Sequence, residues 1–233
     1  MDKIFGSKRY KVVKAKVQPK AYSLDEATKL VCDTASAKFD ETVEVCVRLG
    51  VDPRKADQNV RGSVELPHGL GKTVRVAVFA KAEKMKEALD AGADIAGAED
   101  LVEKVMGGFM DFDSIVATPD MMGQVGKLGK VLGPRGLMPS PKVGTVTFDI
   151  AKTVKAIKAG RADYQVEKAG IVQAPVGKVS FGADKIRENA TAFIQAINRA
   201  KPATSKGVYL TSCYISATMG PGIQLEVDAL RTI

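Results

Sequence analysis

The chain has 233 residues, of which 45% are hydrophobic and 27% are charged, and its formal net charge is +8. This composition supports a folded core and excludes global disorder, and no apolar run approaches the roughly 18 residues that a membrane-spanning helix needs. Three widely spaced cysteines and a single histidine argue against a disulfide scaffold or a zinc cluster, so we expect reduced thiols, a cytoplasmic protein, and no metal or other cofactor.

The N-terminal part begins with a predicted amphipathic helix, SLDEATKLVCDTA, in which Ser23 and Glu26 have the spacing of a capping box. The next segment, ETVEVCVRLG at 41–50, alternates valine and leucine with more polar residues. This period of two predicts a strand with one buried face. GSVEL at 62–66 predicts a second strand.

From residue 73 the pattern changes to alternating strands and helices. Strands are predicted at TVRVAVFA (73–80), near 94–96, at SIVATPD (114–120) and at TVTFDI (145–150). Helices are predicted at 81–92, at 98–108, from about residue 120, and at 151–160. Strict alternation of this kind indicates a mostly parallel sheet covered by helices.

After Gly160 the sequence predicts short strands within 161–181, a long amphipathic helix over about 184–200, and strands within 207–218 and 223–227. Each flank is too short for a substantial core of its own. We therefore predict an α/β and α+β protein of two domains. Residues 1–68 and 160–233 form a split α+β domain, and residues 69–159 form an inserted three-layer α/β, Rossmann-like domain.

The positive charge is concentrated in the flanks. Residues 1–69 carry 13 basic and 10 acidic side chains, residues 160–233 carry 9 and 6, and together they hold +6 of the net +8. This distribution favours a polyanionic partner, nucleic acid before membrane.

The segment KLGKVLGPRGLMPSPKVGT at 127–145 has the composition of a rigid basic loop. Its glycines do not have the dinucleotide-binding spacing, and HGLGKT at 68–73 lacks the first P-loop glycine and leads into a strand. GPRG at 133–136 has the form of a KH-module loop, but the prolines that follow oppose the second helix that such a loop requires. MDFDS at 110–114 has paired acids without a histidine and reads as a solvated turn. An enzyme is therefore the weaker class, and a nucleotide-dependent α/β enzyme stays as the alternative.

The stretch GKLGKVLGPRGLMP at 126–139 resembles the signature of the bacterial large-subunit ribosomal protein family numbered one. Further stretches resemble the family in the family's order. They are AKFDETVEV (37–45), DPRKADQNVRG (52–62), LPHGLGKTVRV (66–76), MDFDSIVATPDMM (110–122) and TMGPG (218–222). The resemblance covers essentially the whole chain. Gln173 departs from the resemblance, since many members have histidine there, so an RNA contact at this position is not predicted.

The resemblance implies a split domain that binds large-subunit rRNA and forms the mobile stalk beside the exit site. It also implies help in releasing exit-site tRNA, and repression of translation through binding to the mRNA of the protein's own operon. The protein would be a monomer when free of the ribosome, with no membrane partner and no catalytic or metal site.

The resemblance, together with the residue types, predicts which side chains contact RNA. An aromatic ring for stacking, hydroxyls, glycines that allow close approach and cations for phosphate suit this chemistry. The predicted rRNA-binding residues are Lys38, Phe39, Thr42, Lys168, Gly170, Ser212, Thr218, Met219 and Gly220. Secondary RNA contacts are expected from Lys127, Lys130 and Arg135.

Overall fold

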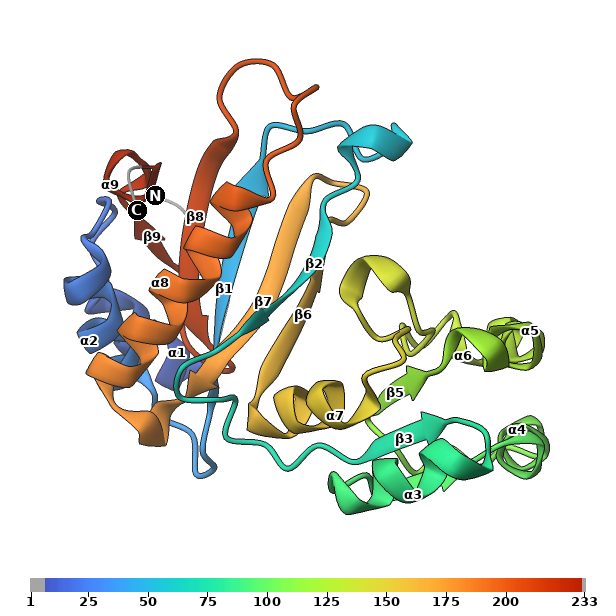
Figure 1. Cartoon of the computed structure of the whole chain (residues 1–233). Coiled ribbons are helices and arrows are strands. Elements are labelled where there is room, and N and C mark those ends of the chain that lie inside the picture. Colours follow the sequence, from blue (N-terminus) through green and yellow to red (C-terminus); the bar gives the residue numbers. More distant parts are fainter. Residues whose placement is uncertain (1–6, 232–233) are drawn as a thin grey trace. The chain divides into compact units, whose positions relative to one another are not determined.

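The computed structural model describes residues 7–231 and consists of two compact units (Figure 1). One unit, here called the terminal unit, contains Met1–Gly71 and Ala162–Ile233, and the other, the inserted unit, contains Lys72–Arg161. The sequence placed the corresponding limits at 68/69 and 159/160. Within residues 7–231, none of the helices combines the length and the apolar character that crossing a bilayer requires.

The terminal unit is built on an antiparallel sheet of four strands in the order β7-β1-β8-β9. The strands are β1 (Thr42–Leu49), β7 (Ile171–Lys178), β8 (Leu210–Ala217) and β9 (Ile223–Leu225). The alternation predicted for residues 42–49 is confirmed, because every second position of β1 is buried and the positions between them are more exposed. The sheet thus has one face in the core and one polar face.

Two helices cover the buried face of this sheet, α2 (Leu24–Thr34) and α8 (Ala183–Arg199), and α8 runs across the sheet in Figure 1. The serine cap predicted at the start of α2 is confirmed, since Ser23 Oγ accepts a hydrogen bond from the Glu26 N–H at 3.3 Å. Phe193, Ile194 and Ile197 of α8 lie in the core, as the apolar spacing predicted. The opposite, polar side of the sheet, which we call the open face, leaves Glu44, Arg48, Gln173 and Tyr214 exposed.

The smaller elements of the terminal unit are α1 (Lys8–Ala15), η1 (Ala56–Gln58), β2 (Arg61–Glu65), η5 (Val179–Phe181) and α9 (Val227–Arg231), and β2 pairs with β6 (Arg161–Gln165). Helix α1 was not predicted. It starts at a serine cap, where Ser7 Oγ accepts from the Tyr10 N–H, but only Val13 is buried. With one buried residue, α1 has no apolar face, and the sequence therefore shows no amphipathic pattern that would predict it.

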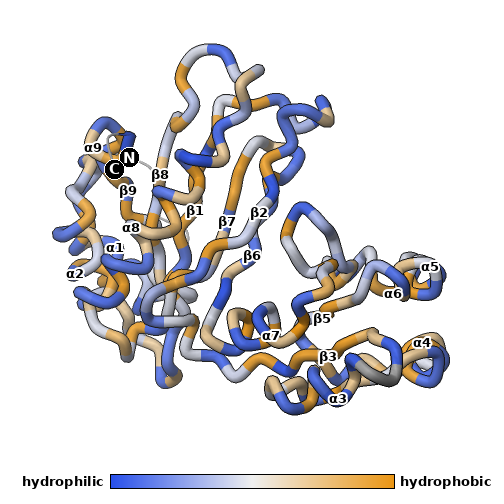
Figure 2. Tube along the Cα trace, in the orientation of Figure 1, coloured by the Kyte–Doolittle hydropathy of each residue, from blue (hydrophilic) through white to orange (hydrophobic). Residues whose placement is uncertain are grey.

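The inserted unit has a parallel sheet of three strands, β4-β3-β5, between two layers of helices. The strands are β3 (Val76–Phe79), β4 (Ile95–Gly97) and β5 (Ser114–Ala117). Helices α3 (Ala82–Asp90) and α7 (Ile150–Ala159) pack with one face, and α4 (Glu99–Met106) with the other. Strand β3 is buried along its whole length, and Figure 2 shows that its residues are hydrophobic. This confirms the expected three-layer α/β arrangement.

Two sequence-based expectations for the inserted unit are wrong. TVTFDI does not form a strand, because within this described stretch only Val146 makes a parallel bridge to Ala117, and α7 already begins at Ile150, which packs in the core. The stretch from residue 127 is also not a loop throughout. The helix predicted from about residue 120 forms as a broken helical run, η2 (Pro119–Met121), α5 (Met122–Val125), η3 (Gly126–Leu128) and α6 (Gly129–Leu132). This run extends to Leu132 and so occupies the first part of the stretch. Leu128 and Leu132 are fully buried one helical turn apart, which favours helix there; a further short turn, η4 (Pro141–Val143), follows.

Asn189 of α8 holds the chain where it leaves the terminal unit. Its amide is fully buried, accepts from the His68 N–H at 3.0 Å, and donates to the carbonyls of Gly69 (3.0 Å) and Val176 (2.7 Å). We expect Asn189→Ala to lower the free energy of unfolding by about 2 kcal/mol, because it leaves buried backbone groups unpaired. Urea unfolding measures this change. Asn198→Ala, which removes a single bond to the Leu230 carbonyl, should cost less than about 1 kcal/mol; equal losses would contradict the assignment.

Candidate nucleic-acid interface

One group of predicted residues meets at the end of the open face where β1 begins. Phe39 lies in the connection between α2 and β1 and exposes 56% of its surface, and Met219 lies just after β8 and exposes 48%. The two segments are joined through Thr42 and Thr218. The Thr218 N–H donates to the Thr42 carbonyl, and the Thr218 hydroxyl accepts from the Thr42 N–H, both at 3.0 Å. Residues 176 positions apart in sequence therefore form one surface.

The buried carboxylate of Glu41 holds the two segments of this surface together. It accepts hydrogen bonds from the N–H groups of Ser36 (2.9 Å), Ala37 (2.8 Å) and Met219 (2.9 Å). Burial alone would raise the pKa of Glu41, but the three N–H groups and the nearby charge of Arg9 outweigh burial and lower it. One carboxylate thus ties the segment that carries Phe39 to the turn that carries Met219.

A second set of contacts holds the Phe39 segment against the end of β7. Asp40 accepts from the Ser180 N–H at 3.1 Å and from the Ser180 hydroxyl at 2.7 Å. Lys178 donates to the Thr42 hydroxyl at 2.8 Å and to the Asp40 carbonyl at 3.3 Å. Arg9 of α1 donates to the Ser36 hydroxyl at 3.0 Å. The exposed Lys38, together with Lys178 and Arg9, places positive charge around Phe39.

The sequence did not single out Glu41, Lys178, Asp40 or Arg9, because their roles depend on partners distant in the chain. Six cations of the basic N-terminal run lie in the described part, in or just after α1. They are Lys8, Arg9, Lys11, Lys14, Lys16 and Lys20, whereas Lys3 lies outside the described residues. The expected glycine at the turn, Gly220, closes a tight turn by donating to the Ala217 carbonyl at 3.0 Å.

The other predicted residues lie at the opposite end of the open face. Ser212 of β8 and Ile171 of β7 both pair with Arg48 of β1, from its two sides. Ile171 directly follows the turn that carries Lys168 and Gly170. Ser212 lies on the same face as Thr218, but the two are six positions apart, which corresponds to about 20 Å along a strand. Gly170 is buried, has a φ of 75°, and accepts from the Leu49 N–H at 2.8 Å, so it shapes the turn that exposes Lys168.

Acidic side chains lie between these two ends. Glu44, the third residue of β1, is exposed, and the pKa of the Cys46 thiol at mid-strand is raised by burial and by the charges of Glu167 and Glu44. Negative charge in the middle disfavours phosphate there. Along β1, the open face is therefore suited to phosphate at the two ends of the strand.

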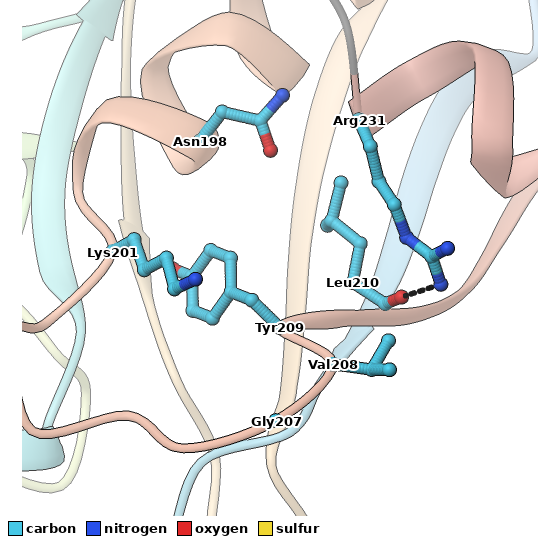
Figure 3. A pocket seen from close by; sticks show the side chains of 7 residues that line it. All are labelled: Asn198, Lys201, Gly207, Val208, Tyr209, Leu210 and Arg231. Carbon is cyan, nitrogen blue, oxygen red and sulfur yellow. Dashed lines mark hydrogen bonds between the residues drawn. The ribbon is translucent and has the colours of Figure 1, made fainter.

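A hollow of about 330 Å³ lies at the start of β8, where Val208, Tyr209 and Leu210 form part of its lining (Figure 3). Arg231 donates to the Leu210 carbonyl at 3.0 Å, and the Lys201 ammonium lies 6.0 Å from the centre of the Tyr209 ring. Arg231 also pairs with Asp228 at 2.5 Å. Arg231 thus attaches α9 to the sheet, and its guanidinium is already engaged by protein acceptors.

The inserted unit lacks a phosphate cradle at the P-loop-like segment. Lys72 pairs with Asp113 at 3.0 Å, and the chain continues into β3 instead of a helix N-terminus. Asp111 and Asp113 both contact Arg75, so the acids of MDFDS are ion-paired rather than merely solvated. This arrangement gives no support to a nucleotide-dependent enzyme.

The secondary candidates occupy the helical run and the loop after it. Lys127 lies in η3 and donates to the Gln124 side chain at 2.8 Å, Lys130 lies exposed in α6, and Arg135 is exposed in the turn that follows. Helix α6 precedes GPRG, but the residues after it form an extended segment and η4, which is not the helix that a KH module needs.

Comparison with known proteins identifies the family. Residues 31–221 match the family model described as "Ribosomal protein L1p/L10e family". A curated relative, the large ribosomal subunit protein uL1 of Syntrophobacter fumaroxidans, is 59% identical over 227 residues, which cover 97% of this chain and 97% of the relative. The resemblance read from the sequence is thereby confirmed: the chain belongs to the ribosomal protein L1p/L10e family.

Proposed function

We propose that the chain is a structural component of the large ribosomal subunit that binds a folded segment of its rRNA through the terminal unit. The family and the relative are ribosomal proteins, which supports this function over that of an enzyme. The observation that carries the site assignment is the exposure of Phe39 and Met219 on two loops that Glu41 holds together.

Binding at this end of the sheet would combine stacking with phosphate contacts. An exposed aromatic ring on a fixed loop can stack on a base without losing much conformational freedom on binding. Lys38 and Lys178 would contact phosphates, while Thr42 and Thr218 keep the two loops in register. At the other end, Lys168, Arg48 and Ser212 would contact a second part of the RNA about 20 Å away. A folded RNA presents both parts at once, whereas a single-stranded one would have to be ordered first.

A salt series tests this proposal. With about four phosphate contacts, the affinity for a stalk fragment of the large-subunit rRNA should fall about 50- to 150-fold between 50 and 200 mM salt. The same fragment with scrambled sequence should bind more weakly at every salt concentration. Equal affinity for the two RNAs would reject specific rRNA binding.

The same surface also supports translational repression as a second proposal. A protein site that reads the fold of an RNA binds an mRNA segment of the same shape, because shape and 2′-hydroxyl contacts carry little base identity. Competition between the rRNA fragment and the leader of the protein's own mRNA tests this, and failure of the leader to displace the fragment would exclude it. Help in the release of exit-site tRNA stays a prediction from the family resemblance.

A further inference from the structure

A groove lies beside the Met219 turn, on the side of the sheet's edge strand. It has a volume of about 420 Å³ and is bounded by the end of α1 and the segment after it, by Tyr214 of β8, and by the turn between β8 and β9. Pro221 and Gly222, which follow Met219 and Gly220, form part of its wall. The groove therefore lies next to the proposed RNA surface, because adjacent residues of one turn belong to both.

The groove has an aromatic ring with open access. Tyr214 is exposed to 39% and lies on the open face, paired with Cys46 on one side and Gln224 on the other. A Cβ added at Gly222 would lie 3.9 Å from the Tyr214 ring, so this glycine borders the ring at ordinary contact distance. A flat ring in a groove with one open side suits the stacking of a base.

The wall opposite Tyr214 is fixed in place. The Tyr22 hydroxyl accepts from the Gln18 N–H at 2.9 Å, and the Tyr22 N–H donates to the Gln224 carbonyl at 2.9 Å. Lys20 lies with its ammonium 4.8 Å from the centre of the Tyr22 ring. These contacts attach the segment after α1 to β9, so the groove exists before any ligand binds.

The charges and polar groups at the rim match a nucleotide. Lys14 and Lys20 both line the groove, both are exposed, and neither forms an ion pair with any of the side chains that the structure describes. Gln18 and Gln224 add side-chain amides, which can donate to and accept from base edges. The groove thus offers two cations for phosphate, two amides for a base edge and one ring for stacking. Together these match the chemical groups of a nucleotide.

We infer that this groove holds one unpaired nucleotide of the bound RNA, with its base stacked on Tyr214 and its phosphates near Lys14 and Lys20. The inference rests on the proposed rRNA binding and adds a base-specific contact to it. An extruded base has its Watson–Crick edge free, so the amides of Gln18 and Gln224 can select among bases.

An abasic scan of the rRNA fragment tests the inference on the full chain. We expect one position at which removal of the base weakens binding to the unchanged protein about 5- to 10-fold. The same removal should have no further effect on Tyr214→Ala, which itself binds the intact fragment about 5- to 10-fold more weakly. Tyr214→Phe keeps the ring and should bind like the unchanged chain.

A spectroscopic measurement checks the stacking independently. The chain has no tryptophan, so Tyr214→Trp introduces a single reporter whose emission should be quenched when the fragment binds. Phe148→Trp, at an exposed position of the inserted unit, is the matched control and should not be quenched.

The outcomes separate the two proposals. If the fragment binds specifically but no abasic position is coupled to Tyr214, and the emission of the Tyr214→Trp variant is not quenched, the groove inference is overturned while rRNA binding stands. If the unchanged chain does not prefer the fragment over scrambled RNA, the proposed function itself fails.

Discussion

Phe39→Ala should weaken binding of the rRNA fragment by about 10- to 100-fold while leaving the fold intact. Loss of one stacked base costs about 1–3 kcal/mol. Phe39 is 56% exposed, so its removal leaves no cavity in the core. Filter binding at fixed salt measures the change in affinity, and thermal unfolding checks that stability is unchanged.

The matched control is Phe148→Ala. Phe148 exposes 55% of its surface, almost as much as Phe39, but it lies in the inserted unit and packs against the Lys84 ammonium at 4.6 Å. Its removal should leave RNA affinity unchanged. If Phe39→Ala binds as tightly as Phe148→Ala, the site at the start of β1 is wrongly assigned.

The salt dependence distinguishes stacking from charge. Phe39→Ala removes no cation, so the slope of affinity against salt should stay the same while the affinity falls. Lys178→Met should instead reduce the slope by about one phosphate contact. If Phe39→Ala also reduced the slope, the substitution would have displaced Lys38 of the same loop and removed its phosphate contact.

The sequence predicted those parts of the fold that local periodicity determines. The alternation of residues 42–49 and the apolar stripe of residues 184–200 each bury a continuous face, so they indicated β1 and α8. Helix α1 has a single buried residue, Val13, and its Arg9 side chain contacts Ser36, 27 positions away in the sequence, so no local periodicity marks it. The β-branched residues of TVTFDI favoured a strand, but the core required Ile150 at the start of a helix instead.

The members of the candidate site that the sequence predicted are those marked by residue type and by the family motifs. Phe39, Thr218 and Met219 were identified through the family resemblance. Glu41 was not, because its role depends on the Met219 N–H, 178 positions away, and a single acid in a strand-forming segment has no pattern of its own. Ser212 and Thr218 were predicted to face the same side, but the length of β8 places them at opposite ends of the sheet.

Glu41→Ala should have the largest combined effect on stability and RNA binding. It leaves the N–H groups of Ser36, Ala37 and Met219 without their acceptor, and we expect a loss of about 3 kcal/mol in the free energy of unfolding. RNA affinity should also fall by at least about 10-fold, because Phe39 and Met219 are no longer held in register. Urea unfolding and filter binding measure the two effects. Glu44→Gln, at an exposed position of β1, should leave stability within about 0.5 kcal/mol.

The charge of Glu41 makes a pH-dependent contribution whose sign follows from its lowered pKa. Because the folded pKa lies below the ordinary value of 4.5, the contribution is fully present above about pH 4.5 and is lost as the pH falls through the folded pKa. Glu41→Gln, which keeps the shape without the charge, should therefore be less stable than the unchanged chain at pH 7, with the difference shrinking at pH 3. Proton binding to this one group thus weakens the connection between the loop that carries Phe39 and the turn that carries Met219. A difference in unfolding free energy that is equal at pH 7 and pH 3 would mean that the ionised carboxylate does not hold the two loops together.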